Sequence, residues 1–316
     1  MRRTTDMEGH SGSIIEEIKK KKKHHKPVWW VKRIIFLLVL GLITLYMLFP
    51  TGYMVMRSLM NYSDASSTNP VYYFPKTGIT FMNYVTMFQT RQTSEYVTSS
   101  YSYLKYLWNT LKIAIFNCIA VPLSCSICAY SFARIKWKSR NVVFMIMMAS
   151  VMIPGSVLTV PQYVLFASLG WTESALPLTI PTLFGGGAMN IFLMVQFMRN
   201  IPYEIENAAK IDGANVFVRY LVITLPMCVP ILIYIIIGTF NSVWGDFTGP
   251  LIYLKDKNQW TLAVAIYYNS TSISEGMDEP NVRMAICTFI TLIPAIIFFC
   301  YQKTLIEGIQ MGAIKA

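Results

Sequence analysis

The feature that most constrains this chain is a series of long, nearly uninterrupted apolar blocks. They reach or approach the roughly 20 residues that an α-helix needs to cross a bilayer core. Their residues follow neither the period of a half-buried strand nor that of an amphipathic helix. The blocks cover residues 31–56, 108–132, 142–165, 176–198, 227–243 and 284–301. We therefore predict an all-α fold class, a polytopic membrane protein with six transmembrane helices.

Charged residues are scarce and unevenly placed. They make up 14% of the 316 residues, whereas soluble domains carry about 25%. The formal net charge of +11 gathers at the block edges and in the lysine run of residues 19–26, which favours a topology signal or anionic lipid over nucleic acid. We interpret residues 1–30 as a basic cytoplasmic tail, with Trp29 and Trp30 as interfacial anchors of the first span.

The distribution of Lys and Arg orients the spans. The tail, the loop 134–140, the polar insert 199–226 and the C-terminal residues carry most of the basic side chains, and six spans put all of them on one side. By the positive-inside rule this side is the cytoplasm. We expect a multi-pass protein of the inner (cytoplasmic) cell membrane with both termini cytoplasmic and residues 57–107 forming an extracytoplasmic loop.

The usual chemical motifs are missing from the sequence. No span holds Asp or Glu in its interior, which disfavours an ion-coupled carrier, and no G-x-x-x-x-G-K-[ST] phosphate loop or nucleophile elbow occurs. We expect a non-catalytic subunit that is driven by another protein. All six cysteines lie inside apolar blocks, so we expect no disulfide framework. We also expect no metal site, because neither the C-x-x-C of Cys125 and Cys128 nor the pair His24 and His25 has further ligands near it.

Proline and glycine interrupt several spans. Such residues free backbone carbonyls and allow hinging, which suits helices along a moving pathway. Ordinary kinks explain them equally well, because both residues are frequent in spanning helices. The interruptions are Pro122, Pro154, Gly155, Pro161, Pro181, the triplet 185–187 and Pro294.

The insert 199–226 is the most informative polar segment. Pro202 suits a first helical turn, Glu204 and Glu206 favour the positive end of its dipole, and Gly213 suits a left-handed turn before a second helix that ends near Thr224. Small alanines give the first helix a flat face that could sit in a partner's groove. A helix lying on lipid headgroups is the alternative, but it would carry larger apolar residues.

This segment resembles the E-A-A loop of binding-protein-dependent ATP-binding-cassette importers, whose pattern ends in Gly and then I-x-L-P. Glu206, Ala208, Ala209 and Gly213 fill its places and Asn207 replaces the first alanine; the last part is residues 223–226. In that family the loop is a coupling helix that fits a cleft of the ATPase. The resemblance implies that the ATPase-coupling residues are Glu206, Asn207, Ala208, Ala209, Lys210, Asp212, Gly213 and Ala214.

Further motifs extend the resemblance over most of residues 105–316, in the carbohydrate branch of the family and its type I importer fold. They are N-T-L at 109–111, A-Y-S-F-A-R at 129–134, M-I-P at 152–154, I-D-G-A at 211–214, W-G-D-F-x-x-P-L at 244–251 and G-x-x-x-G-A-I-K at 308–315. Residues 108–316 would form the permease core. The family pattern explains neither the N-terminal tail nor the enlarged outer loop.

The resemblance also implies partners. They are a second permease subunit in a heterodimer, an ATPase dimer that carries ATP and Mg²⁺, and an extracytoplasmic solute-binding protein that delivers a sugar or oligosaccharide. This chain itself would carry no cofactor. A glycerol-phosphate or polyol importer of the same architecture is one alternative, and an ATPase-independent channel or scaffold is another.

Amide, carboxylate and aromatic side chains near the ends of two spans are candidates for the substrate pathway, because sugars bind such groups. A structural role is the alternative for each of them, and the partner permease could supply most sugar contacts. The candidates are Asn190, Asn241, Trp244 and Asp246.

Overall fold

The longest helices follow the apolar blocks. In the computed structural model, which describes residues 26–68, 70–89, 91–94, 97–101, 103–271 and 279–313, three helices exceed 30 residues: α2 (Lys26–Ser58), α5 (Tyr103–Ala133) and α16 (Pro280–Ala313). Long helices satisfy every backbone polar group internally, which a lipid environment demands. Residues 1–25 of the predicted tail lie outside the described residues.

The third and fourth spans are broken helices, and the breaks fall at proline and glycine residues that we predicted as interruptions. The third consists of α6 (Arg140–Ser150) and α7 (Gly155–Ser168), which are bent by 99°. Pro154 stands at the break with extended backbone, because proline has no N–H and disfavours helix in the residue before it. The fourth comprises α8 (Leu176–Thr179), the 3₁₀ helix η1 (Ile180–Phe184) and α9 (Ala188–Arg199). Three glycines with positive φ, at 185–187, separate η1 from α9.

The polar insert forms a loop of short helices. Helix α10 (Tyr203–Ile211) is followed by α11 (Val216–Val218), the π-helix η2 (Arg219–Thr224) and α12 (Leu225–Met227). The fifth span, α13 (Val229–Trp244), turns away from them by 76°. The short helix, glycine turn and second helical segment that we predicted are all present.

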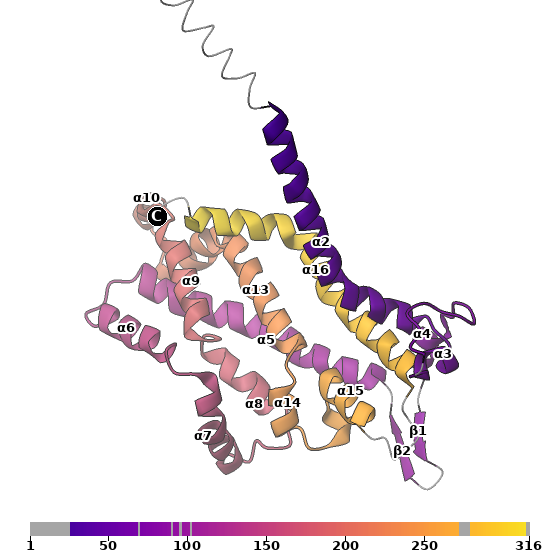
Figure 1. The fold of residues 1–316 in the computed structure, drawn as a ribbon. Coiled ribbons are helices and arrows are strands. Elements are labelled where there is room, and N and C mark those ends of the chain that lie inside the picture. Colours follow the sequence, from indigo (N-terminus) through magenta and orange to yellow (C-terminus); the bar gives the residue numbers. More distant parts are fainter. Residues whose placement is uncertain are drawn as a thin grey trace, which may run out of the picture.

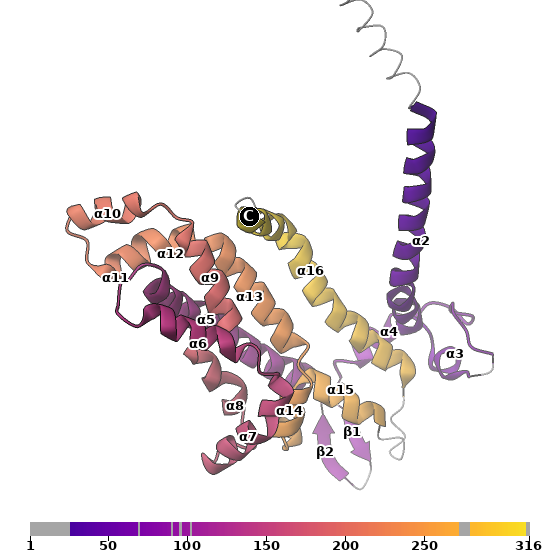
Figure 2. The ribbon, with the colours of Figure 1, turned by 60° about the vertical axis from the view of Figure 1, so that its left-hand side comes forward.

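The end of the molecule that lies away from α10 carries the remaining small elements (Figures 1 and 2). They are α3 (Tyr62–Ser66), α4 (Met82–Thr86), the antiparallel hairpin of β1 (Arg91–Ser94) and β2 (Val97–Tyr101), α14 (Thr248–Tyr253), η3 (Lys257–Gln259) and α15 (Leu262–Thr271). We call this the hairpin end, and the end that carries α10 and the C-terminal part of α16 the α10 end. Helix α5 begins at Tyr103 rather than at 108, so the loop between the first two spans is shorter than predicted.

The helices support the predicted membrane fold. Within the described residues, four helical segments are long and apolar enough to span a bilayer, and six are when each bent pair counts as one span. The all-α polytopic fold class is therefore confirmed, and the two-stranded hairpin is a small addition outside the spans.

Helix α5 is the centre of the packing. Its main contacts are with α9 and α13, and its buried face carries small residues such as Ala114, Cys125, Ala129 and Ala133. Small side chains let helices approach closely, which drives packing where lipid removes the hydrophobic effect. Helix α2, in contrast, contacts mainly α16, and its apolar span is exposed.

Candidate functional site

The α10 loop, residues 201–227, is shaped by a glycine turn. Gly213 has a φ of +84°, and its N–H donates to Lys210 O at 3.2 Å while Ala214 N–H donates to Ala209 O at 2.9 Å. This pair of bonds is a Schellman motif, which ends a helix on a left-handed residue. Asn215 then caps α11 by accepting a hydrogen bond from Val218 N–H at 2.9 Å. The loop is thus a defined helix–turn–helix rather than an irregular connection.

Most residues predicted for ATPase coupling face outward. Asn207, Ala208, Lys210, Asp212 and Gly213 are exposed, and Ala209 and Ala214 are half-buried. The loop also exposes large apolar side chains, among them Ile211 at 87% and Phe217 at 67%. We had predicted a weak face of alanines, so these apolar residues are an unforeseen part of the surface.

Glu206 differs from the other predicted coupling residues because it is 5% exposed and faces the protein interior. Its Oε1 lies 3.2 Å from Arg134 Nε and accepts a hydrogen bond from the Thr224 hydroxyl at 2.7 Å. The Tyr130 hydroxyl donates to Oε2 at 3.5 Å. The Glu206 side chain therefore does not form part of the outward surface of α10.

Arg134 joins the end of α9 and helix α10 to the end of α5. One of its terminal nitrogens donates to the carbonyls of Met198 and Ile201 at the end of α9. A cation at a helix C-terminus also interacts favourably with the helix dipole. The guanidinium lies 4.3 Å from the ring centroid of Tyr203, whose hydroxyl donates to Ala133 O at 3.0 Å. The foot of α10 is therefore fastened to both α5 and α9.

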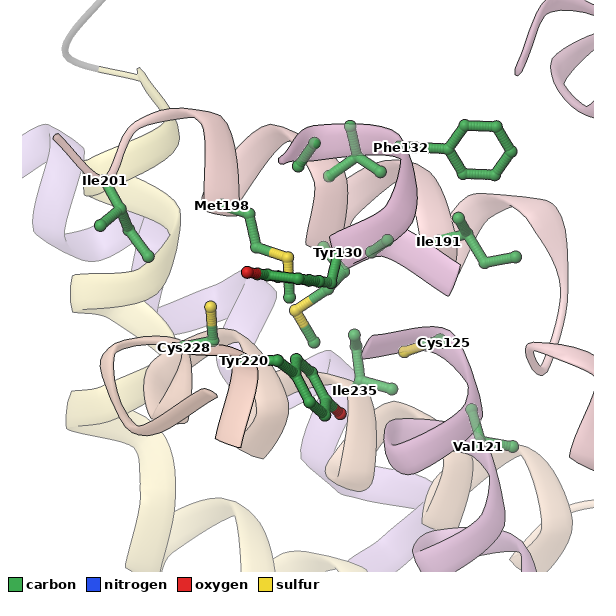
Figure 3. Close-up of a cluster of buried hydrophobic side chains, with 14 residues drawn as sticks. Val121, Cys125, Tyr130, Phe132, Ile191, Met198, Ile201, Tyr220, Cys228 and Ile235 are labelled. Atoms are coloured by element: carbon green, nitrogen blue, oxygen red, sulfur yellow. The ribbon is translucent and has the colours of Figure 1, made fainter. Parts of the chain in front are cut away.

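A second contact connects the π-helix η2 to α5. The rings of Tyr130 and Tyr220 lie 5.2 Å apart, and the Tyr220 and Ser126 hydroxyls share a hydrogen bond of 2.7 Å. Figure 3 shows both tyrosines within the buried cluster that α5, α9, η2 and α13 build together. A π-helix is frequently found at functional sites, and here it aims a tyrosine into the core.

A cavity of about 710 Å³ lies between α5, the broken fourth span and α13. Two of the four predicted pathway residues, Asn190 and Asp246, line it. Asn241 is exposed and does not line it. Trp244 is buried elsewhere, where its Nε1 donates to Ile290 O at 3.2 Å and its ring stacks on Phe240 at 5.2 Å. The cavity thus brings Asn190 and Asp246 together and leaves out Asn241 and Trp244.

Polar side chains hold the broken span against α5. Asn117 accepts a hydrogen bond from the Thr182 hydroxyl at 2.9 Å and donates to Leu178 O at 3.0 Å. The Ser124 hydroxyl accepts from Gly185 N–H at 3.2 Å, and the Asn190 amide donates to Gly186 O at 2.8 Å. These contacts satisfy backbone groups that the break leaves free, as a membrane interior requires.

Sequence reasoning missed several residues of both regions. Arg134 belonged to a recognised motif but was read only as a basic topology signal. The cavity hydroxyls lie inside apolar blocks, where isolated Ser and Thr give no pattern. The missed cavity residues include Asn117, Thr182, Thr239 and Ser242. No group of three His, Cys, Asp or Glu side chains suited to a metal occurs in the part of the chain that the structure describes.

Comparison with known proteins places these features in a family. Residues 123–310 match the family described as binding-protein-dependent transport system inner membrane component. A putative ABC transporter permease protein of Caldicellulosiruptor sp. (strain Rt8B.4) is 30% identical over 215 residues, or 68% of this chain and 77% of the relative. The maltose/maltodextrin transport system permease protein MalG of Vibrio vulnificus is 29% identical over 220 residues, covering 67% and 72%.

The fold agrees with this match. A chain in the crystal structure of a bacterial ABC transporter involved in the import of the acidic polysaccharide alginate aligns with a TM-score of 0.75. The alignment covers 88% of this chain and 97% of that one at 18% identity, so it supports the fold alone. This chain therefore belongs to the binding-protein-dependent transport system inner membrane component family, the permease subunits of ABC transporters.

Proposed function

We propose that this chain is a permease subunit of an ATP-driven importer that takes up a sugar or oligosaccharide, and that its α10 loop docks on the ATPase. The named relatives include a maltose/maltodextrin permease, which supports a carbohydrate cargo. The complex would contain a second permease subunit, an ATPase dimer that holds ATP and Mg²⁺, and an extracytoplasmic binding protein. The basic residues near α10 support our proposal that this end and both termini face the cytoplasm.

The observation that carries the docking proposal is the exposure of Ile211. An isoleucine that is 87% exposed beside a rigid glycine turn is suited to insert into a cleft, because docking recovers the apolar burial that the free chain lacks. The small residues Ala208, which is exposed, and Ala209, which is half-buried, allow a partner's backbone to come close. Glu206 would act indirectly, by fixing α10 to α5 through Arg134.

The test replaces Ile211 with aspartate in the full complex. We expect Ile211→Asp to weaken ATPase binding by roughly 30-fold or more, the loss expected when an interface hot spot worth about 2 kcal/mol is removed. The measurements are co-purification of the ATPase and ATP-dependent uptake. Ile135→Asp is the control, because Ile135 is an exposed isoleucine outside the α10 loop.

An ATPase-independent channel or scaffold predicts a different result. Uptake would then persist in Ile211→Asp and would not depend on ATP. A phosphate-bearing cargo is also disfavoured, because no Lys, Arg or His is among the described residues that line the cavity.

A further inference from the structure

Asp246 dominates the charge of the cavity. Of the described residues that line it, Asp246 alone has a side chain that is ordinarily ionised at neutral pH. A single charge in a partly enclosed space acts over a longer distance than at an open surface, because the surrounding protein screens it less. This chain's side of the cavity is therefore electronegative.

The position of Asp246 strengthens this field. The residue follows the C-terminus of α13, where Gly245 N–H and Asp246 N–H still donate to the helix at 3.0 and 3.3 Å. A carboxylate there adds to the negative end of the helix dipole and gains nothing from it. The end of α13 thus does not account for an aspartate at this position, and its carboxylate instead accepts a hydrogen bond from the first turn of α14.

The carboxylate is held in place by the backbone that follows it. Its Oδ1 accepts a hydrogen bond from Gly249 N–H at 3.1 Å, and a Cβ at Gly249 would lie 2.6 Å from Oδ2. Burial raises the pKa of Asp246, and hydrogen bonds from the backbone of Gly249 and Thr248 oppose this rise. A cargo that donates hydrogen bonds or carries positive charge would relieve the cost of burial.

Two hydroxyl groups of α13 line the cavity together with Asp246. Thr239, Ser242 and Asp246 are spaced by three and four residues, and all three line the cavity. This spacing puts Thr239 and Ser242 on one face of the helix, one turn before the aspartate. Neutral hydroxyls and one carboxylate match the donor groups of an uncharged or amino-substituted sugar.

We infer that Asp246 is a specificity-determining residue that makes this chain's side of the pathway accept neutral or cationic glycans and disfavour acidic ones. The inference rests on the proposed function.

The test measures the charge preference of the cavity directly. Ser242→Cys introduces an exposed thiol one turn from Asp246, and the assembled importer reacts at pH 8 with a cationic or an anionic methanethiosulfonate reagent. We expect Asp246→Asn to lower the cationic-to-anionic rate ratio by about tenfold, as the loss of one nearby charge predicts. Asp246→Glu should keep the ratio. A ratio that Asp246→Asn leaves unchanged overturns the inference.

Two controls make the result specific. Ser168→Cys lies on α7 outside the cavity, so its ratio should not respond to Asp246→Asn. The reaction of the six native cysteines is measured in the parent importer and subtracted.

An uptake arm separates this inference from the proposed function. ATP-dependent uptake of a neutral oligosaccharide tests the proposed function. An increase in the uptake of a uronate oligosaccharide of the same length in Asp246→Asn tests the inference. Absence of any ATP-dependent glycan uptake in the unmodified importer overturns the proposed function, whereas neutral uptake with an unchanged reagent ratio overturns the inference alone.

Discussion

Arg134 and Glu206 form an ion pair with an Nε–Oε1 distance of 3.2 Å, and their side chains are 1% and 6% exposed. Removing two charges from water is expensive, and the cost is recovered only when hydrogen bonds satisfy the remaining polar atoms. Thr224 supplies one such bond to Glu206, and the carbonyls at the end of α9 accept two from Arg134 Nη2, whereas Arg134 Nε and Nη1 are buried without a hydrogen-bond partner. The pair therefore connects the α10 loop to the long central helix α5.

Arg134→Met should destabilise the protein by about 3–5 kcal/mol, because it leaves the Glu206 carboxylate buried without a counter-charge. The double variant Arg134→Met with Glu206→Gln should be more stable than Arg134→Met alone, since the unpaired charge is then removed. Chemical unfolding of the solubilised chain measures both. Lys136→Met, at an exposed site two residues away, should change the stability by less than about 0.5 kcal/mol. Equal effects of Arg134→Met and Lys136→Met would show that the pair is energetically unimportant.

Gly213 is required for its backbone conformation and not for space. A Cβ there would meet nothing within 4 Å, but the φ of +84° is costly for a β-branched residue. Gly213→Val should weaken ATPase co-purification, because the α10 turn would rearrange, whereas Gly213→Asn should retain most of it, because asparagine tolerates left-handed backbone. Hydrogen exchange at the Ala214 amide should be faster in the valine variant. If both variants bind equally, the turn geometry does not control docking.

The spans and the glycine turn could be predicted from sequence because each depends on local rules. Apolar length identifies a membrane helix, and a glycine after a short helix identifies a left-handed cap. The proline at 154 and the glycines at 185–187 were recognised as interruptions. The bend of 99° at Pro154 was not predictable, because the angle depends on what the two halves pack against.

The interior role of Glu206 could not be predicted for a related reason. The helix dipole explains a carboxylate near the start of α10. Nothing in the neighbouring sequence indicated that Arg134 would lie against it. Such pairing depends on how α5 and α10 meet in space. The same holds for the cavity, where Asn190 and Asp246 were recognised but Trp244, also at the end of α13, packs towards Ile290.

Gly186 allows the broken fourth span to touch α5. A Cβ at this residue would lie 2.3 Å from Val121 Cγ1, and its φ is +60°. Gly186→Ala should therefore cost more than the roughly 1–2 kcal/mol of left-handed backbone alone, as measured by thermal stability of the solubilised chain. Val121→Ala in the same chain should recover part of the loss by removing the two nearest methyl groups.

Gly187 provides the matched control for this substitution. Its φ is +101°, but a Cβ there would meet nothing within 4 Å. Gly187→Ala should show a backbone cost without a clash, and Val121→Ala should not improve it. Improvement of both alanine variants by Val121→Ala would contradict a specific contact at Gly186.

Asp64 should make the loop at the hairpin end sensitive to acid. Its Oδ2 accepts hydrogen bonds from the N–H groups of Thr77 and Lys76, each at 2.8 Å, and the Thr77 bond is the main reason that its pKa is lowered. A carboxyl with a lowered folded pKa stabilises the native state above its unfolded pKa of about 3.9, and this stability is lost as the pH falls through the folded value. The protection of the Lys76 and Thr77 amides, taken as the intrinsic exchange rate divided by the observed rate at the same pH, should therefore fall below about pH 4. Asp64→Asn should exchange faster at neutral pH and lose this acid dependence, and an unchanged acid response in Asp64→Asn would assign the transition to another group.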